Sequence, residues 1–315
     1  MGGVSQDPFE LLTSQPLVFG GAPIGGLYAP VSDADAAATL AAAWQAGIRA
    51  FDTAPHYGVG LSERRIGDFL ADRPRPEFIV STKVGRRLVP ASSPVDGVDG
   101  FYDTPALSRV RDYTADGVRR CLEDSLRRLR LDRVDIALIH DPDDFMTQAL
   151  DSAYPALAEL RAAGVIGAIG VGMNYTAPLA WFVSRADLDC VLVAGRYSLL
   201  DPSAADELLP LCAERGVKVL AGGVFNSGIL ADPRDGATYD YAPASAEVLA
   251  RVRRIRDVCD AYGVPVAAAA LRFTLRHPAV TAAVVGARSA SEITADASYL
   301  TLDIPDELFA ALASA

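Results

Sequence analysis

Cysteine and histidine are scarce in this sequence, which limits the metal and redox chemistry that it can support. Its four cysteines, at 121, 190, 212 and 259, lie far apart and form no CxxC pair, so neither a zinc site nor a disulfide framework is predicted. Its three histidines show no HxxxH spacing, which argues against a histidine-based metal site. We therefore expect no bound metal and reduced, structural thiols.

An excess of basic residues and long apolar runs are also missing. The chain has 29 Lys and Arg against 40 Asp and Glu, a formal net charge of −11, which disfavours binding to nucleic acid or an anionic membrane. No apolar run is long enough to span a bilayer, and residues 1–15 lack the pattern of a signal peptide. We expect a cytoplasmic protein with a small-molecule substrate, as a monomer or weak homodimer.

Short β-rich segments alternate with longer helical patterns along the whole chain. Eight segments are predicted as strands: 17–19, 48–52, 78–83, 134–140, 166–171, 191–194, 217–221 and 280–285. Helices are predicted between them at 33–46, 62–71, 115–129, 147–163, 178–184, 204–215 and 245–276, the last broken at 263–265. Eight repeats favour a (β/α)8 barrel over a doubly wound open sheet. No linker divides the chain, so residues 1–315 are predicted to form a single domain.

Three predicted strands end in an ionisable residue. Asp52, Lys83 and His140 close the second, third and fourth strands, and Tyr57 follows Asp52 by five positions. The carboxyl ends of the strands of such a barrel meet at one mouth, and ligands bind there. Each residue alone has an ordinary structural interpretation. The carboxylate could cap a helix or turn, the phenol could line a wall of the barrel mouth, the lysine could lie at the surface, and the histidine could be a hydrogen-bonded core residue. Their coincidence at three matching strand ends favours a shared site.

These four residue types can together transfer a proton at a hydroxyl or carbonyl carbon. A phenol has a pKa of about 10, which is too high for easy exchange near neutrality. A neighbouring ammonium favours the phenolate, and a carboxylate keeps that ammonium charged and in place. We therefore expect Tyr57 to exchange the proton, Lys83 to lower the pKa of Tyr57, Asp52 to pair with Lys83, and His140 to orient the reacting oxygen.

The motifs around these residues resemble those of the aldo-keto reductases, over about residues 17–300. The matching segments are FDTAPHYGVGLSERRIG, STKVG, VDIALIHDPD, IGAIGVGMN and VVGARSASEITAD. The resemblance implies a (β/α)8 barrel, a nicotinamide cofactor across its mouth, no metal, and the Asp52, Tyr57, Lys83 and His140 tetrad. It also implies that Asn174 holds the nicotinamide carboxamide.

The segments expected to hold the cofactor depart from the family pattern in places. Met173 stands where Ser is common, and Ala194 stands where Gln is common. In the family an aromatic residue at the end of the seventh strand commonly stacks on the nicotinamide. Here that position is replaced within the run AGGVF, residues 221–225, which contains Gly222 and Phe225. The nicotinamide should therefore depend more on Asn174, with Phe225 as an apolar wall.

The last segment bears on the choice between NAD and NADP. Gly286 and Arg288 match positions near the cofactor phosphates, and Ser289 begins a helix whose N–H groups favour anions. Glu292 stands where many NADP-dependent members carry Arg, and Asp296 stands where Asn is usual. Because carboxylates repel a 2′-phosphate and accept from ribose hydroxyls, we predict NAD over NADP, although Arg288 alone could admit NADP.

Two long loops, 85–112 and 231–244, follow the third and seventh strands on the side of the expected site. They are predicted to form substrate walls, unless they are surface insertions without a role. The residues expected to border the substrate are Tyr28, His56, Phe101, Tyr102, Phe145 and Phe225.

Further motifs are similar to those of the aldose 1-dehydrogenases of the same family. They are GRRLVP, the helix DYTADGVRRCLEDSLRRL, HDPDD and NSGIL. They imply oxidation of an aldose such as L-fucose at C1 to the lactone, with NAD as the hydride acceptor. Pyridoxal 4-dehydrogenase, a broad aldehyde or ketone reductase, and a non-catalytic cofactor-binding regulatory subunit are the alternatives.

Overall fold

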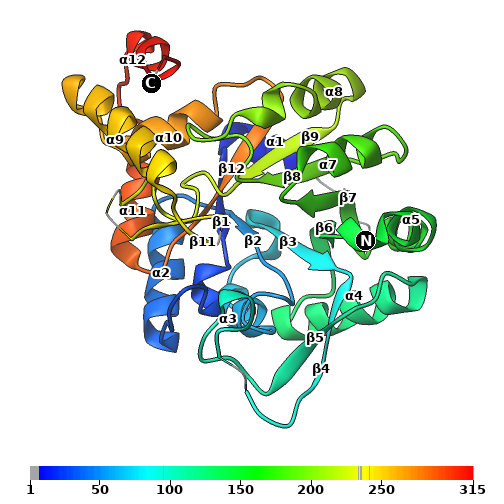
Figure 1. Cartoon of the computed structure of the whole chain (residues 1–315). Helices are drawn as coiled ribbons and strands as arrows, with labels where there is room; N and C mark the ends of the chain where they lie inside the picture. The colour runs from blue at the N-terminus through cyan, green and yellow to red at the C-terminus, as the bar shows by residue number, and fades with distance from the viewer. Residues whose placement is uncertain (1–6, 95, 233, 235, 241, 315) are drawn as a thin grey trace.

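A closed barrel of parallel strands forms the centre of the computed structural model, which describes residues 7–314 except 95, 233, 235 and 241 (Figure 1). Around the barrel the strand order is β1-β12-β9-β8-β7-β6-β3-β2. Their bounds are β1 Leu17–Gly20, β2 Ala50–Asp52, β3 Ile79–Val84, β6 Val134–His140, β7 Ile166–Met173, β8 Cys190–Ala194, β9 Lys218–Gly222 and β12 Val280–Gly286. The prediction of a (β/α)8 barrel is confirmed, and the open doubly wound sheet is wrong.

The strand register brings the ionisable strand ends to one mouth of the barrel. Asp52 is level with Gly20 on β1 and with Ser81 on β3, two positions before Lys83. His140 ends β6 opposite Gly172 on β7. Because all neighbours are parallel, these ends open onto the same face.

Helices cover the outside of the barrel (Figure 1). They are α2 Asp33–Gln45, α3 Leu61–Leu70, α4 Ala115–Leu129, α5 Met146–Gln148, α6 Tyr154–Ala162, α7 Thr176–Val183, α8 Leu208–Arg215, α9 Ala246–Ala261, α10 Val266–Thr274, α11 Ala290–Tyr299 and α12 Asp306–Leu312. Side-chain caps begin several of them: Ser32 Oγ accepts from the Asp35 N–H, and Thr114 Oγ1 accepts from the Gly117 N–H. Gly216 ends α8 at a φ of 71°, the left-handed geometry that glycine accepts without strain.

Two predicted helices are interrupted in the structure. The segment predicted at 147–163 contains a π-helical stretch, Ala149–Ala153, between α5 and α6. The segment predicted at 204–215 begins with a separate 3₁₀ turn, Ser203–Ala205, and α8 starts only at Leu208. Pro202 precedes that turn, and no side-chain cap starts α8. The predicted helix therefore began four residues earlier than α8 does.

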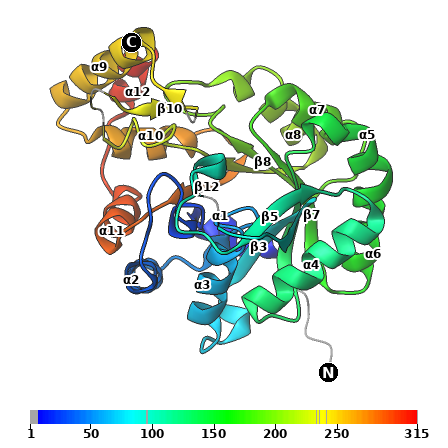
Figure 2. The same cartoon turned by 60° about the horizontal axis from the view of Figure 1, so that its bottom comes forward.

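A short helix that was not predicted, α1 Pro8–Ser14, closes the end of the barrel opposite the mouth (Figure 2). Phe9 and Leu12 of this helix are buried among the inward-facing residues of the strands, which include Val18, Ile136 and Leu220. The Asp7 carboxylate caps it by accepting from the Phe9 N–H at 2.9 Å. The barrel interior is thus a packed core below the mouth.

The two long loops each contain an antiparallel hairpin. In the first, β4 Arg86–Pro90 pairs with β5 Leu107–Arg111, so this segment is partly regular. In the second, β10 Thr238–Tyr239 pairs with β11 Ala242–Pro243. A second apolar cluster joins this part of the chain to α9, α10 and α12.

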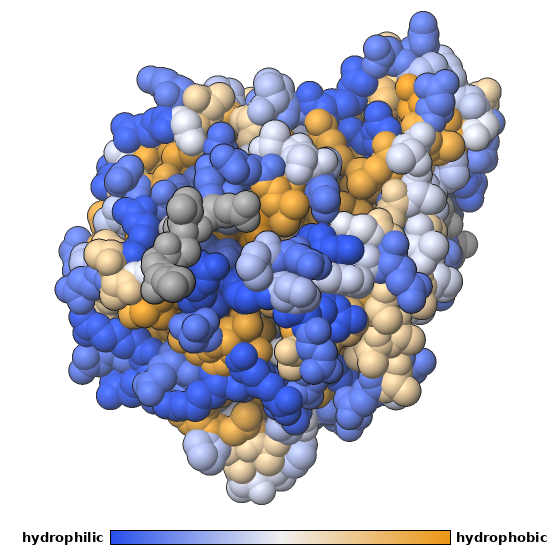
Figure 3. Space-filling view, turned by 180° about the vertical axis from the view of Figure 1, so that it is seen from behind, coloured by the Kyte–Doolittle hydropathy of each residue, from blue (hydrophilic) through white to orange (hydrophobic). Residues whose placement is uncertain are grey.

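The face seen from behind is mainly hydrophilic, with separate apolar areas between the polar side chains (Figure 3). Of the helices described, none has the length and apolarity needed to cross a bilayer.

Candidate active site

Lys83 and Asp52 form a buried ion pair at the barrel mouth. The Lys83 ammonium donates to Asp52 Oδ2 at 2.6 Å and to the Thr53 carbonyl at 2.9 Å. Ser81 donates its hydroxyl to the other carboxylate oxygen of Asp52. Burial, the largest single effect, would lower the pKa of Lys83, but Asp52 and Tyr57 together outweigh it and the pKa of Lys83 is raised above its ordinary value. The lysine is therefore a permanent cation.

The Tyr57 side chain lies against this cation. Lys83 Nζ is 4.6 Å from the centre of the Tyr57 ring, and its positive charge acts to lower the pKa of the phenol. Burial nevertheless raises the pKa of Tyr57, and the opposing effect of Lys83 is the smaller of the two. The expectation that Lys83 brings the phenol below its ordinary pKa is wrong for the protein by itself, because the low-dielectric cavity disfavours the phenolate more strongly.

A tight loop places Tyr57 over the mouth. Gly58 adopts a φ of 60°, and a Cβ at this position would lie 2.2 Å from the Gly25 carbonyl oxygen. The Thr53 and Ser62 hydroxyls hydrogen-bond each other at 2.8 Å and join the start of the loop to α3. The loop between β2 and α3 is thus fixed at both ends, and a side chain at 58 is excluded.

His140 faces Tyr57 across the mouth. Their ring centres are 5.9 Å apart with the planes at 90°. The Tyr113 hydroxyl donates to the His140 carbonyl at 2.6 Å and fixes the end of β6. Burial, and then the positive charges of Arg86 and Lys83, hold the pKa of His140 well below its usual value. The imidazole is therefore neutral, and among the described residues its buried Nδ1 has no hydrogen-bond partner.

These side chains open into a cavity of about 890 Å³. Of the predicted residues, it is lined by Tyr57, Lys83, His140, Asn174, Arg288, Tyr28, His56, Phe101 and Tyr102. The structure does not bring Phe145 or Phe225 to the described lining. Phe145 packs against Tyr113, with ring centres 5.3 Å apart, and Phe225 packs between the two main apolar clusters. Each contributes to the core instead of the substrate wall.

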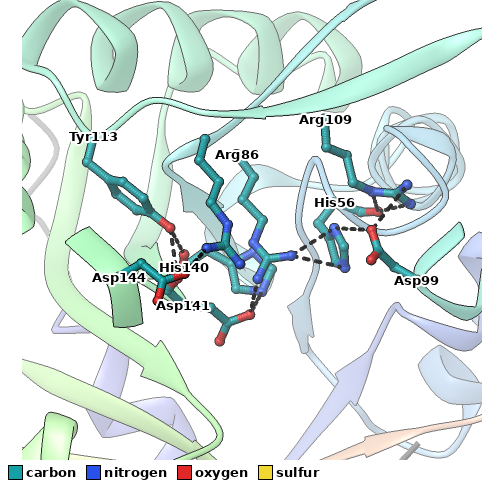
Figure 4. A network of polar contacts seen from close by, with 9 residues as sticks. His56, Arg86, Asp99, Arg109, Tyr113, His140, Asp141 and Asp144 are labelled. Atoms are coloured by element: carbon teal, nitrogen blue, oxygen red, sulfur yellow. Dashed lines mark hydrogen bonds and ion pairs between the residues drawn. The ribbon is translucent and has the colours of Figure 1, made fainter. Parts of the chain in front are cut away.

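A row of charged residues beside His140 was missed by sequence reasoning (Figure 4). Arg86 donates to Asp141 at 2.7 Å and lies 3.3 Å from His56 Nδ1. Arg109 donates to the His56 carbonyl at 2.9 Å and lies 3.5 Å from Asp99. The signals in the sequence were the motifs GRRLVP and HDPDD, which place Arg86 next to the lysine strand and Asp141 next to His140.

His56 lies in the middle of this row and is neutral. Burial, followed by the charges of Arg86 and Arg109, lowers the pKa of His56 to about 2. Its 4.0 Å approach to Asp99 is therefore a polar contact between a neutral ring and a carboxylate. Phe101 packs edge-on against the imidazole at 5.3 Å and nearly parallel to the Tyr57 ring at 6.1 Å.

The residues predicted to hold the cofactor divide into two groups. Asn174 and Arg288 line the cavity, and no side-chain hydrogen bond occupies the Asn174 amide in the described part of the chain. Gly222, Gly286, Ser289, Glu292 and Asp296 do not contribute to the described lining. Gly222 and Asp296 are buried, whereas Gly286 and Glu292 are exposed at the end of β12 and the start of α11.

Hydrogen bonds at the start of α11 hold Glu292 in place. Ser289 Oγ accepts from the Glu292 N–H at 3.2 Å, and the Glu292 carboxylate accepts from the Arg288 N–H at 2.8 Å. Burial, and then the charge of Glu292, raises the pKa of Asp296 to about 7. Within the described residues, no group of three or more His, Cys, Asp or Glu is arranged to hold a metal ion.

Comparison with known proteins agrees with this geometry. The sequence model of the Aldo/keto reductase family matches residues 16–315. A D-threo-aldose 1-dehydrogenase from Pseudomonas sp is 45% identical over 95% of this chain and 93% of its own length. A pyridoxal 4-dehydrogenase from Microbacterium luteolum is 44% identical over 96% and 94%, respectively.

A solved structure is similar over the same extent. The glycerol dehydrogenase AKR11B4 from Gluconobacter oxydans superposes with a TM-score of 0.74 at 26% identity, covering 95% of this chain and 90% of that one. The chain therefore belongs to the aldo/keto reductase family and is an oxidoreductase that acts on CH–OH groups with a nicotinamide cofactor.

Proposed function

We propose that this protein oxidises an aldopyranose, such as L-fucose, at C1 to the lactone, with NAD as the hydride acceptor. The observation that carries the proposal is the Tyr57–Lys83–Asp52 arrangement opposite His140, in a cavity whose wall is rich in charged hydrogen-bonding groups. The similarity to the Pseudomonas aldose dehydrogenase supports the same substrate class.

In this reaction Tyr57 exchanges the proton. As phenolate it accepts the proton of the C1 hydroxyl, while the C–H bond at C1 breaks and its electron pair leaves with the hydrogen. The products are the lactone, reduced nicotinamide and one proton. Lys83 stabilises the phenolate by charge and hydrogen bond, and Asp52 fixes Lys83. Neutral His140 hydrogen-bonds the C1 oxygen and adds no further positive charge beside Lys83 and Arg86.

The residues around the mouth fit a nicotinamide dinucleotide. The Asn174 amide is open for the carboxamide, and its backbone is fixed by Arg196, which donates to the Asn174 carbonyl at 2.9 Å. Arg288 lies in the same cavity with its side chain 49% exposed and only a 3.9 Å contact to Glu292, so its guanidinium can reach a phosphate. When bound, the oxidised nicotinamide supplies the hydride acceptor.

Glu292 supports a preference for NAD over NADP. Its carboxylate is tied to the Arg288 backbone, so negative charge is fixed at the position expected for a 2′-phosphate. We expect Glu292→Arg to raise the ratio of kcat/KM for NADP to that for NAD by at least about tenfold, and Ser291→Arg, on a different side of the helix, to change it little. A wild-type enzyme with the higher kcat/KM for NADP would refute the preference.

The substrate is tested by following NADH formation with L-fucose, D-arabinose and pyridoxal. We expect the aldoses to be oxidised with the higher kcat/KM. Efficient turnover of pyridoxal alone would support the alternative that the 44% identical pyridoxal dehydrogenase suggests. Tight cofactor binding without turnover of any substrate, including simple aldehydes with NADH, would support a non-catalytic regulator.

We place the enzyme in the cytoplasm, as a monomer or weak homodimer without nucleic-acid or membrane partners. Its net charge of −11 supports the absence of nucleic-acid and anionic-membrane partners. Sedimentation at several protein concentrations would test the oligomeric state.

A further inference from the structure

We propose that Arg86 and Asp141 form the subsite that recognises the C2 hydroxyl of the aldose, next to the reacting C1 oxygen. The inference rests on the proposed function and names residues that sequence reasoning did not single out. Both side chains line the cavity, and they join each other at 2.7 Å directly beside His140 (Figure 4).

Asp141 is held in an unusual backbone conformation that turns its carboxylate towards the cavity. Its φ is 41°, which is rare for a residue other than glycine. The Asp141 N–H donates to the Gly172 carbonyl at 2.9 Å, and the Tyr113 hydroxyl shares its single hydrogen between the His140 carbonyl at 2.6 Å and the Asp141 carbonyl at 2.9 Å. These hydrogen bonds thus hold the unusual backbone conformation of Asp141 in place, as is common at binding sites.

The carboxylate of Asp141 retains free acceptor capacity. Oδ2 accepts from Arg86 and lies 3.5 Å from His140 Nε2, whereas Oδ1 receives no hydrogen bond from the part of the chain that is described. A carboxylate has about four acceptor positions, so it can bind a hydroxyl without releasing Arg86. Its side chain is 20% exposed, which leaves it within reach of a ligand in the cavity.

Arg86 is positioned by the first hairpin. It begins β4 immediately after Gly85, whose φ is 99° and where a Cβ would lie 2.2 Å from the Tyr113 ring. The side chain is 14% exposed, and its guanidinium lies between Asp141 and His56. Its planar fork can donate to a hydroxyl oxygen while it still contacts Asp141.

The geometry relates this pair to C2. Tyr57 and His140 define the position of the C1 oxygen, and Asp141 lies beside that same His140 ring. In a vicinal diol the second oxygen lies within hydrogen-bonding range of groups next to the first. A hydroxyl both donates and accepts, so a carboxylate and a guanidinium side by side satisfy both capacities.

A purely structural role explains the pair less well. Removing two charges from water costs about as much as their attraction returns, so a largely buried ion pair contributes little net stability. The hairpin also carries a comparable pair outside the described cavity lining, Arg111 with Asp144 at 2.6 Å, whose side chains are 42% and 74% exposed. The two pairs differ in their access to the substrate, which makes the outer pair a matched control.

The test compares L-fucose with its 2-deoxy analogue in wild type, Asp141→Asn and Asp144→Asn. We expect wild type to favour L-fucose in kcat/KM by roughly 10- to 100-fold, the effect of a hydrogen bond to a charged group. Asp141→Asn should reduce that ratio towards one, and Asp144→Asn should keep it. Asparagine tolerates positive φ, so the Asp141 variant should retain its backbone, which its melting temperature would check.

Arg86→Lys provides a second variant, because it keeps the positive charge but removes the planar guanidinium. It should also lower the ratio of kcat/KM for L-fucose to that for the 2-deoxy analogue. The proposal is overturned if wild type oxidises L-fucose and Asp141→Asn discriminates against the 2-deoxy sugar as strongly as wild type does. If wild type oxidises no aldose, the proposed function fails first and this subsite fails with it.

Discussion

At the scale of single residues, the Lys83–Asp52 pair determines the chemistry of the site. Both side chains are almost fully buried, with 2% and 3% exposed, and each satisfies the charge of the other. Tyr57 obtains its stabilising cation from this pair. The pair therefore contributes more to function than to folding stability, since a buried ion pair gains little net free energy.

Lys83→Met should destabilise the fold by about 3–5 kcal/mol, because it leaves the Asp52 carboxylate buried without its cation. The double variant Lys83→Met with Asp52→Asn should recover much of that loss, since no uncompensated charge remains. Urea denaturation measures both free energies of unfolding. A single variant as stable as wild type would show that water already reaches the pair.

The sequence predicted which residues meet at the mouth, but it did not predict their protonation states. The pKa of Tyr57 depends on how completely the loop and Phe101 bury it, which residue types alone do not reveal. The low pKa values of His56 and His140 depend first on burial and then on the charge of Arg86, whose position is set by a hairpin that was not predicted.

At the scale of elements, Glu63 links α3 to both β3 and α4. Its fully buried carboxylate accepts from Thr82 Oγ1 at 2.7 Å and from Arg128 Nε at 2.6 Å. Thr82 directly precedes Lys83, so this contact anchors the strand that carries the lysine.

Glu63→Gln should destabilise the protein by about 2–4 kcal/mol, because the amide cannot pair with the guanidinium by charge and turns a donor towards it. Glu123→Gln is the matched control on α4: its carboxylate pairs with Arg127 at 2.6 Å but is 64% exposed. That change should stay within about 0.5 kcal/mol. Equal losses in the two variants, measured by thermal unfolding, would contradict the special role of Glu63.

The strand–helix alternation could be predicted because each βα unit carries a local pattern, and a glycine follows several of the helices, as Gly216 follows α8. The β4–β5 hairpin could not be predicted, because Arg86 pairs with Arg111, which lies 25 positions later in the sequence, and the strands lack a clean alternation. The helix α1 has only seven residues, too few for a periodic signal, and its role depends on the barrel above it.

At the scale of the whole molecule, the two ends of the barrel have different tasks. The mouth carries charged and strained residues, and the opposite end is closed by α1 with an apolar seal in which Leu12 is 1% exposed. This separation between chemistry at the carboxyl ends of the strands and stability at the other end is general for such barrels.

Leu12→Ala should cost about 2–5 kcal/mol of unfolding free energy, because it leaves a cavity in the seal. Its kcat/KM per folded molecule should match wild type, since the mouth is at the other end. Glu10→Gln, on the exposed side of α1, should change stability by no more than about 0.5 kcal/mol. An altered KM in Leu12→Ala would show that the two ends are coupled.

The central claim, that Tyr57 accepts the proton of the sugar, is tested most directly by the pH dependence of L-fucose oxidation. The pKa of Tyr57 is raised above its ordinary value, so phenolate is the minor form near neutrality and increases about tenfold per pH unit below that pKa. We predict that log kcat/KM rises with pH from neutrality upwards in wild type. Tyr57→Phe should keep NAD binding but lose this rise and nearly all turnover. A Tyr57→Phe enzyme with the wild-type rate and pH profile would contradict the account.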